Sequence, residues 1–287
     1  MISHKMINIA LVTPLKDEID NIDKFFKSVS EQSLRIKCLV IVENDSSDGS
    51  KEYLNRFKGL DNVEELVILN LTFDDKSYDL GFKYSKVVHH GFEYLKNASF
   101  YKELDFVGIL DCDCFPEKDY YEKLVHFMDQ HPKVGISSGL IFTEEGNPHI
   151  ANTNWVRGGC RLWKISCFED TGFPIEPSPD AITVALAHYY GWESKTLKDA
   201  KVTSREVNVR MSNYKNQGRR IYYRGNSLFY AFSKFAFYFF VKREIKIAFD
   251  FINGYLGDYF SAKPRIKDMR VRKYYQFYLI SKLKAKF

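Results

Sequence analysis

The first 110 residues alternate between short, mostly apolar runs and longer stretches in which apolar residues recur every three or four positions. Short apolar runs rich in Val and Ile are typical of strands covered on both faces, and the longer periodic stretches predict helices. Strands are therefore predicted at 7–12, 38–42, 66–69 and 106–110, and helices at 20–30, 51–58 and 83–96.

This order of strands and helices predicts an α/β fold with a mostly parallel sheet flanked by helices. In such sheets, ligands bind beyond the carboxyl ends of the strands. Polar segments at 13–18, 43–50 and 111–117 leave three of those ends. We expect the three segments to converge on one crevice, which would be the active site.

Residues 116–225 alternate less regularly. The predicted elements are a helix at 120–130, a strand at 134–142, a loop-rich segment at 144–160, a strand at 160–165, a short helix around Phe168 and a helix from 178 to about 190. The last helix has a recognisable start: Ser178 as N-cap, Pro179 in the first turn and Asp180 at the positive end of the helix dipole.

The chain from Asn226 onward is rich in aromatic residues. Its most apolar run, 229–241, is interrupted by Lys234 and is shorter than the roughly 20 residues that a membrane-spanning helix needs. The next stretch, 245–260, contains three charged residues. These patterns predict a helical extension whose aromatics either lie at a membrane interface or pack against the rest of the protein, and both can hold.

Charge separates the same two regions. Residues 226–287 contain 13 Lys and Arg against 4 Asp and Glu, whereas the rest of the chain contains 29 against 33. A basic, aromatic tail behind a mildly acidic body favours a surface that meets lipid headgroups rather than nucleic acid. We therefore expect a catalytic domain over 1–225, divided into a nucleotide-binding half (1–115) and an acceptor half (116–225), and an extension over 226–287.

Cysteine use and the amino-terminal residues bear on location. The five cysteines are an odd number, and Cys112 and Cys114 are too close in sequence for an ordinary disulfide, so free thiols in a reducing compartment are expected. The apolar run at 7–12 is too short for a secretory signal. The expected location is the cytoplasm, at the inner face of the cell membrane if the extension binds lipid.

Asp111 and Asp113 are the most specific chemical signal. In an extended segment, residues two apart point to the same side, so both carboxylates would face one ligand while Cys112 faces away. Two hard oxygen donors at a strand end suit Mg²⁺ or Mn²⁺, which keep coordination sites open for phosphate oxygens. The pattern predicts a metal site for a nucleotide diphosphate.

These motifs resemble glycosyltransferase family two, whose members have a GT-A fold, over residues 7–225. The opening strand, the acidic end of the second strand, the Asp-x-Asp motif and a later acid occur in the family's order. The resemblance implies that a divalent metal is bound by Asp111 and Asp113. It also implies a set of nucleotide-binding residues: Thr13, Pro14, Glu18, Glu43, Asn44, Ser46, Lys86 and Asp111.

The resemblance also assigns the acceptor half. Arg157 and Gly158 resemble the acceptor-side loop, and Asp180 corresponds to the general base, with Glu169 and Asp170 as alternatives. By spacing alone, Asp180 would be a helix-capping acid. The family often has a histidine or a basic segment after the base. Residues matching that segment are expected to contact the diphosphate or the acceptor: Arg205, Gln217, Arg219 and Arg220.

The expected activity is therefore inverting, metal-dependent transfer of a hexose from a UDP- or GDP-sugar to a glycan or lipid-linked acceptor hydroxyl, in cell-surface polysaccharide or glycolipid synthesis. One alternative is a haloacid-dehalogenase-type phosphatase, which also places Asp-x-Asp after an apolar strand. The residues after the motif here, Cys114-Phe115-Pro116, do not suit that class. A second alternative is a non-enzymatic, basic protein that binds membranes or nucleic acid, but it leaves the three polar segments unexplained.

Overall fold

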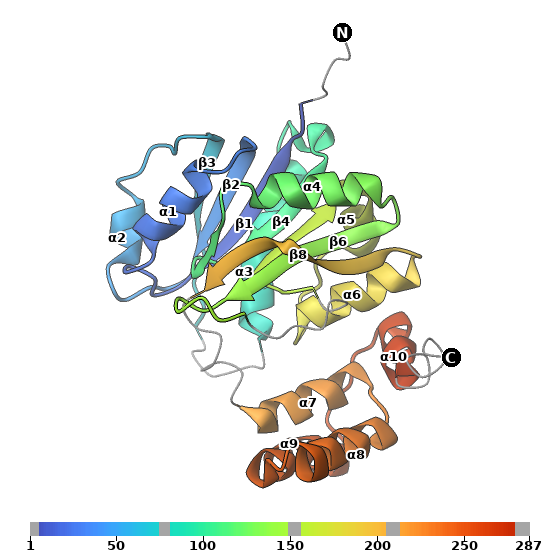
Figure 1. The fold of residues 1–287 in the computed structure, drawn as a ribbon. Helices are drawn as coiled ribbons and strands as arrows, with labels where there is room; N and C mark the ends of the chain where they lie inside the picture. Colours follow the sequence, from blue (N-terminus) through green and yellow to red (C-terminus); the bar gives the residue numbers. More distant parts are fainter. Residues whose placement is uncertain (1–5, 75–80, 149–155, 205–212, 279–287) are drawn as a thin grey trace.

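The structure, a computed structural model, describes residues 6–74, 81–148, 156–204 and 213–278. Its centre is an eight-stranded sheet with the strand order β3-β2-β1-β4-β7-β6-β8-β5, covered by helices on both faces (Figure 1). The strands are β1 (Ile9–Leu15), β2 (Ile36–Glu43), β3 (Val63–Asn70), β4 (Phe106–Leu110), β5 (Cys114–Pro116), β6 (Val134–Phe142), β7 (Cys160–Lys164) and β8 (Glu193–Ser204). The predicted α/β class and mostly parallel first half are confirmed.

The helices of the first 190 residues occupy the predicted positions, with α2 shorter than expected, whereas α7 was not predicted. They are α1 (Ile22–Ser30), α2 (Ser50–Leu54), α3 (Phe82–Asn97), α4 (Tyr120–Gln130), α5 (Ile165–Thr171), α6 (Pro179–Tyr189), α7 (Tyr214–Arg224), α8 (Leu228–Ala236), α9 (Ile245–Phe260) and α10 (Met269–Gln276). A π-helical turn, η3 (Phe237–Val241), follows α8, and a single 3-10 turn, η1 (Tyr101–Glu103), precedes β4.

The sheet is parallel from β3 to β4 and changes direction at β7. Strand β7 is antiparallel to both β4 and β6, and its first residue, Cys160, pairs with Leu110 at the end of β4. The beginning of β7 therefore lies at the same sheet edge as the carboxyl ends of β1, β2 and β4. This reversal brings a loop from the second half of the chain to the predicted crevice.

Strand β8 is the main element that the hydrophobic pattern does not reveal. Alternate residues face inward, but three of its buried positions are Ser194, Thr196 and Ser204. Their hydroxyls make the strand read as polar in a hydropathy pattern, and a register shift between Leu197 and Lys201 interrupts its two-residue period. The three-residue β5 pairs with the end of β8 and is too short to predict.

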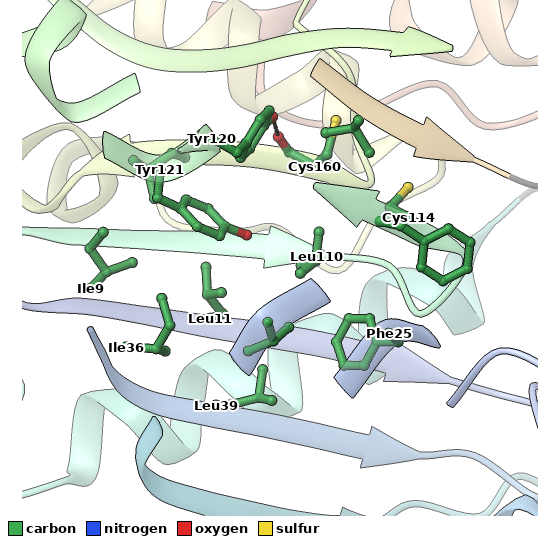
Figure 2. Close-up of a cluster of buried hydrophobic side chains, with 14 of the residues drawn as sticks. Ile9, Leu11, Phe25, Ile36, Leu39, Leu110, Cys114, Tyr120, Tyr121 and Cys160 are labelled. Atoms are coloured by element: carbon green, nitrogen blue, oxygen red, sulfur yellow. Dashed lines mark hydrogen bonds between the residues drawn. The ribbon is translucent and has the colours of Figure 1, made fainter. Parts of the chain in front are cut away.

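Two hydrophobic layers sandwich the sheet. Helices α1 and α4 contribute to one layer and α3, α5 and α6 to the other. Figure 2 shows part of the first layer, where Tyr120 from α4 reaches over the sheet. The Tyr120 hydroxyl donates to the Cys160 carbonyl and accepts from the Gly139 amide at 2.9 Å. This side chain thereby fixes the start of β7 beside β6.

Helices α7 to α9 form a compact group below the sheet, with α10 beside α6 (Figure 1). The group has its own buried cluster, which includes Ile221, Phe251 and Tyr255. Helix α7 precedes the predicted boundary at 226 but packs against α9, so the helical group begins before that boundary. In the described part of the chain, no helix is both long and apolar enough to cross a membrane.

Candidate active site

The loops after β1 and β2 are tied together by their own polar groups. The Asp17 amide donates to the Ser46 hydroxyl at 3.0 Å, and the Ser47 amide donates to the Asp17 carboxylate at 2.7 Å. The buried Glu43 carboxylate accepts from the Ser46 amide at 2.6 Å, and the Asn44 amide side chain donates to the Leu71 carbonyl at 2.9 Å. Glu43, Asn44 and Ser46, which are predicted to bind the nucleotide, therefore also stabilise the conformation of the loops after β1 and β2.

Thr13, Pro14 and Glu18 lie on the β1 side of the same edge. Thr13 is fully buried, and within the described chain its hydroxyl has no hydrogen-bond partner. Glu18 is buried and accepts a hydrogen bond from Asn21, while its amide donates to the Ser50 hydroxyl at 3.0 Å. The three residues are thus placed beside Glu43 and Asn44, as the order of the strands predicts.

The Asp111–Asp113 segment is a turn and not an extended strand end. The Cys114 amide donates to the Asp111 carbonyl at 2.9 Å, which closes a four-residue turn. The expectation that the two carboxylates share a face because of strand alternation was therefore wrong. Asp113 is buried and its carboxylate accepts from the Cys114 thiol at 3.7 Å, whereas Asp111 is half-buried.

Two adjacent glycines bring Asp111 and Asp180 together. A Cβ atom on Gly159 would lie 2.2 Å from the Asp111 carboxylate, and one on Gly158 would lie 2.3 Å from the Asp180 carboxylate. The Asp111 amide donates to the Gly159 carbonyl at 2.7 Å. Asp111 and Asp180, which are almost 70 residues apart in sequence, therefore pack against two consecutive glycines.

Tyr84 on α3 links the same two acids. Its hydroxyl donates to Asp111 at 3.1 Å. Burial, followed by the negative charges of Asp111 and Asp180, raises the pKa of Tyr84 well above its usual range. Tyr84 therefore stays protonated and acts as a hydrogen-bond donor at the site.

Arg161 holds the base of α6 against β7. Its side chain is 1% exposed, and its guanidinium donates to the carbonyls of Arg157 (2.8 Å), Val156 (3.1 Å) and Asp180 (3.1 Å). It also forms an ion pair with the Asp180 carboxylate at 3.6 Å. Because the guanidinium is rigid and multiply bonded, it holds the first turn of α6 and places a positive charge beside the Asp180 carboxylate.

The start of α6 differs from the prediction in one detail. Ser178 has a positive φ of 61° and makes no side-chain capping hydrogen bond. The N-terminal turn is held instead by Arg161 and by Thr183, whose hydroxyl donates to the Pro179 carbonyl at 3.1 Å. Asp180 is thus oriented by the buried arginine rather than by a serine cap.

A cavity of about 510 Å³ opens from Asp180 toward the C-terminal helices. It is lined by Gly158 and Asp180 on one side and by residues of α7, α8 and α10 on the other. Its lining also includes several basic or amide side chains: Arg157, Arg161, Asn213, Asn216, Gln217, Arg220, Arg224, Asn226 and Lys234. Four predicted acceptor-side residues therefore line the same cavity as Asp180: Arg157, Gly158, Gln217 and Arg220.

Other predicted residues lie elsewhere. Arg219 forms an ion pair with Asp258 of α9 at 3.2 Å and does not line the cavity. Lys86 is exposed, with its ammonium 4.9 Å from the Phe82 ring centroid. Asp170 accepts from the Trp192 indole at 2.7 Å, and neither Asp170 nor Glu169 lines the cavity. Arg205 is outside the described residues.

The donor chemistry at Asp111 and Asp113 suits a hard divalent cation, although their ligand set is small. No three His, Cys, Asp or Glu side chains among the described residues are grouped as a metal site. Mg²⁺ commonly binds proteins through one or two carboxylates and takes its remaining ligands from water and substrate phosphates. Two carboxylates on one turn are compatible with that mode.

The hydrophobic pattern did not single out Tyr84, Arg161 or the second glycine of the pair. One of them carried a signal: Arg161 is a charged residue inside the apolar strand β7, and such a residue is rarely buried without a dedicated role. All five cysteines are buried and none is in a disulfide within the described chain, as expected. Burial raises the pKa of Cys160 to about 12, so its thiol is no nucleophile at neutral pH.

The chain matches a known protein family over most of its first two thirds. The family profile described as Glycosyl transferase family 2 matches residues 10–182, more than half of the chain. That range contains Asp111, Asp113, the glycine pair and Asp180. No curated protein sequence matches the chain.

Solved structures share the fold at low sequence identity. Residues 1–349 of S. aureus TarS in complex with UDP-GlcNAc match with a TM-score of 0.55 and 14% identity, covering 93% of this chain and 78% of that one. A longer S. aureus TarS structure is matched over only 38% of its length. The mannosyltransferase PcManGT from Pyrobaculum calidifontis, in complex with GDP-Man and Mn²⁺, matches with a TM-score of 0.53 and 14% identity, covering 97% and 79%.

Proposed function

Because the chain belongs to glycosyl transferase family 2, we propose that it transfers a sugar from a nucleotide-diphosphate sugar to an acceptor hydroxyl with inversion at the anomeric carbon. The observation that carries this proposal is the pair of acids on Gly158 and Gly159. Asp180 lines a cavity large enough for an acceptor, and Asp111, which does not line it, would serve the donor side.

Asp180 is the proposed general base. As the acceptor oxygen bonds to the anomeric carbon, its proton moves to the Asp180 carboxylate, and the bond to the diphosphate breaks with its electron pair on the leaving group. Arg161 acts as a positioning residue, because its hydrogen bonds hold the first turn of α6. One carboxylate on the acceptor side is the requirement for direct displacement, and Asp180 meets it.

The donor side is proposed to use the loops after β1, β2 and β4. Thr13, Pro14, Glu18, Glu43, Asn44 and Ser46 would frame the nucleoside, with Lys86 at the rim. A divalent metal at Asp111 and Asp113, Mn²⁺ or Mg²⁺, would stabilise the charge on the departing diphosphate. The names of the similar structures, which hold UDP-GlcNAc and GDP-Man, support a UDP- or GDP-hexose as donor.

Two substitutions test this assignment. Asp180→Asn should lower kcat about 10²- to 10⁴-fold while nucleotide affinity stays unchanged, because only proton removal is lost. Asp113→Ala should abolish transfer and also weaken metal-dependent nucleotide binding. Donor hydrolysis across a panel of nucleotide sugars and calorimetry with UDP and GDP provide the measurements. An equal loss of nucleotide affinity in both variants would exclude Asp180 as the base.

The acceptor is proposed to be lipid-linked or close to a membrane, in cell-surface polysaccharide or glycolipid synthesis. Support comes from exposed aromatics on α8, η3 and α9, among them Phe229 (68% exposed) and Phe240 (71% exposed). Exposed cations follow them at Lys242, Arg243 and Lys246. Aromatic side chains beside basic ones suit the interface of an anionic bilayer. This would place the enzyme at the cytoplasmic face.

A further inference from the structure

The cavity beside Asp180 contains a pair of cations that the proposed transfer step does not use. Lys234 of α8 and Arg224 at the end of α7 both line it. Lys234 lies over the rings of Phe251 (5.2 Å) and Tyr238 (5.7 Å), and Arg224 lies over Tyr275 (4.8 Å). Aromatic rings thus hold both cations at the wall of the cavity.

No carboxylate neutralises this pair within the described chain. Neither Arg224 nor Lys234 forms an ion pair there, and the single described acid that lines the cavity, Asp180, pairs with Arg161. Burial, and next the charge of Arg224, lowers the pKa of Lys234 to about 8. Two like charges kept together in a half-buried cavity are costly unless an anion binds between them.

Several buried polar atoms around the cavity also lack partners within the described residues. They are the Ser178 hydroxyl, the Asn226 side-chain oxygen and the Arg224 Nε. Buried polar groups of folded proteins are nearly always hydrogen-bonded, so a set of unsatisfied ones around a cavity points to a polar ligand. The ligand that fits has at least one negative charge and one hydroxyl.

The position of the cavity assigns this ligand to the acceptor. Gly158 and Asp180 line the cavity, whereas Gly159, Asp111 and Tyr84 do not. The nucleotide loops after β1 and β2 are also absent from its described walls. The cations are therefore on the acceptor side of the two acids, away from the predicted diphosphate position.

We propose that the cavity between α6 and the C-terminal helices binds an acceptor that carries a phosphate ester or a carboxylate near its nucleophilic hydroxyl. The inference rests on the proposed transferase function and adds the acceptor's charge. The hydroxyl lies at Asp180, and the anionic group lies between Arg224 and Lys234. Arg220 and Gln217 complete the polar wall.

The test uses the full chain with UDP or GDP bound, whichever the donor assay identifies, so that the nucleotide site is filled. Glucose 6-phosphate, glucuronate and glucose are titrated by calorimetry. We expect at least one anionic sugar to bind and glucose to bind at least tenfold more weakly; the stronger of the two anions distinguishes phosphate from carboxylate. Failure of both nucleotides to bind would instead count against the proposed function.

Lys234→Met and its matched control, Lys215→Met, distinguish the loss of a positive charge in the cavity from the loss of a lysine elsewhere on the surface. Lys215 is an exposed lysine of α7 that does not line the cavity. Lys234→Met should weaken binding of the anionic sugar about tenfold, leave nucleotide affinity unchanged and raise Tm at pH 7, because the charged form of Lys234 destabilises the folded chain below about pH 8. Lys215→Met should change neither affinity.

The pH dependence provides a second readout. The other charged or titratable groups around Lys234 are Arg224 of α7 and three tyrosines. Burial raises the pKa of Tyr275 and of Tyr238 to about 12 and also raises that of Tyr230. Affinity for the anionic sugar should therefore fall as pH rises through about 8, and Lys234→Met should remove that fall. Equal affinity for glucose and both anionic sugars, or weaker nucleotide binding in Lys234→Met, would overturn the proposal.

Discussion

At the scale of single residues, the absence of a side chain at two adjacent glycines decides how close the two acids lie. Gly158 and Gly159 have no Cβ, and in that space lie the carboxylates of Asp180 and Asp111. The contacts are with side-chain atoms and not with backbone, so we expect a methyl group there to displace the acids without unfolding the chain. The glycine pair therefore offers a direct test of the proposed roles of the two acids.

We expect Gly158→Ala to lower kcat about a hundredfold by displacing Asp180, with little effect on nucleotide affinity. Gly159→Ala should displace Asp111 and weaken metal-dependent nucleotide binding. Both should retain the wild-type far-ultraviolet circular dichroism. Gly59→Ala is the control, because a Cβ at that position meets no atom within 4 Å. Wild-type kinetics in both site variants would show that the acids are not held by these contacts.

At the scale of elements, the C-terminal helices depend on a close crossing. A Cβ on Gly218 of α7 would lie 2.0 Å from the Phe251 carbonyl oxygen, and one on Gly254 of α9 would lie 1.9 Å from the Lys215 carbonyl oxygen. Backbone therefore touches backbone where the two helices cross. Because α7 also lines the cavity beside Asp180, the crossing helps to hold the basic residues of α7 at that cavity.

Gly254→Ala should reduce the free energy of unfolding by about 1–3 kcal/mol, since the helices must separate to admit the methyl group. Gly257 on the same helix is the matched control, because a Cβ there meets no atom within 4 Å. Gly257→Ala should instead stabilise the chain by about 0.5–1 kcal/mol through helix propensity. Denaturant titration of both variants measures this difference, and effects of the same sign would contradict the crossing.

At the scale of the whole molecule, the aromatic extension has an inner and an outer face. Its inner residues line the cavity beside Asp180 and pack between helices. Its outer residues include Phe240 and Phe249 (48% exposed), both in contact with the Phe239 ring. Packing is thus observed, while membrane contact stays a prediction for the outer face. Deleting 226–287 would remove both functions at once and strip α7 of its partner.

A single substitution on the outer face tests membrane contact without disturbing the packing of the inner residues. Phe240→Asp should weaken binding to vesicles of anionic phospholipid about tenfold or more, because an exposed apolar anchor becomes a negative charge. Transfer to a soluble acceptor should be unchanged. Tyr189→Asp, at a position 60% exposed on α6, is the control for a general change in surface charge. Vesicle co-sedimentation that is identical for Phe240→Asp and the wild type would show that this face does not meet lipid.

Much of the fold could be predicted from the sequence because its signals are local. Strands β1, β2 and β4 are continuous apolar runs, and α3, α4 and α6 have clear periodicity or start signals, so their order predicts a parallel sheet and a crevice at its edge. Strand β8 was missed because hydroxyl residues occupy several of its inward positions. The turn at Asp111–Asp113 was misjudged because turn geometry depends on the Cys114 amide reaching back.

The sequence by itself therefore determined the sheet, the two acids and the basic character of the tail. Only the tertiary structure decided that Asp111 and Asp180 are neighbours, that buried Arg161 pairs with Asp180, and that cations of α7 and α8 line the cavity beside Asp180. The physical reason is distance along the chain. Periodicity and capping are set by residues a few positions apart, whereas antiparallel β7 and the crossing of α7 with α9 join segments whose pairing no local pattern encodes.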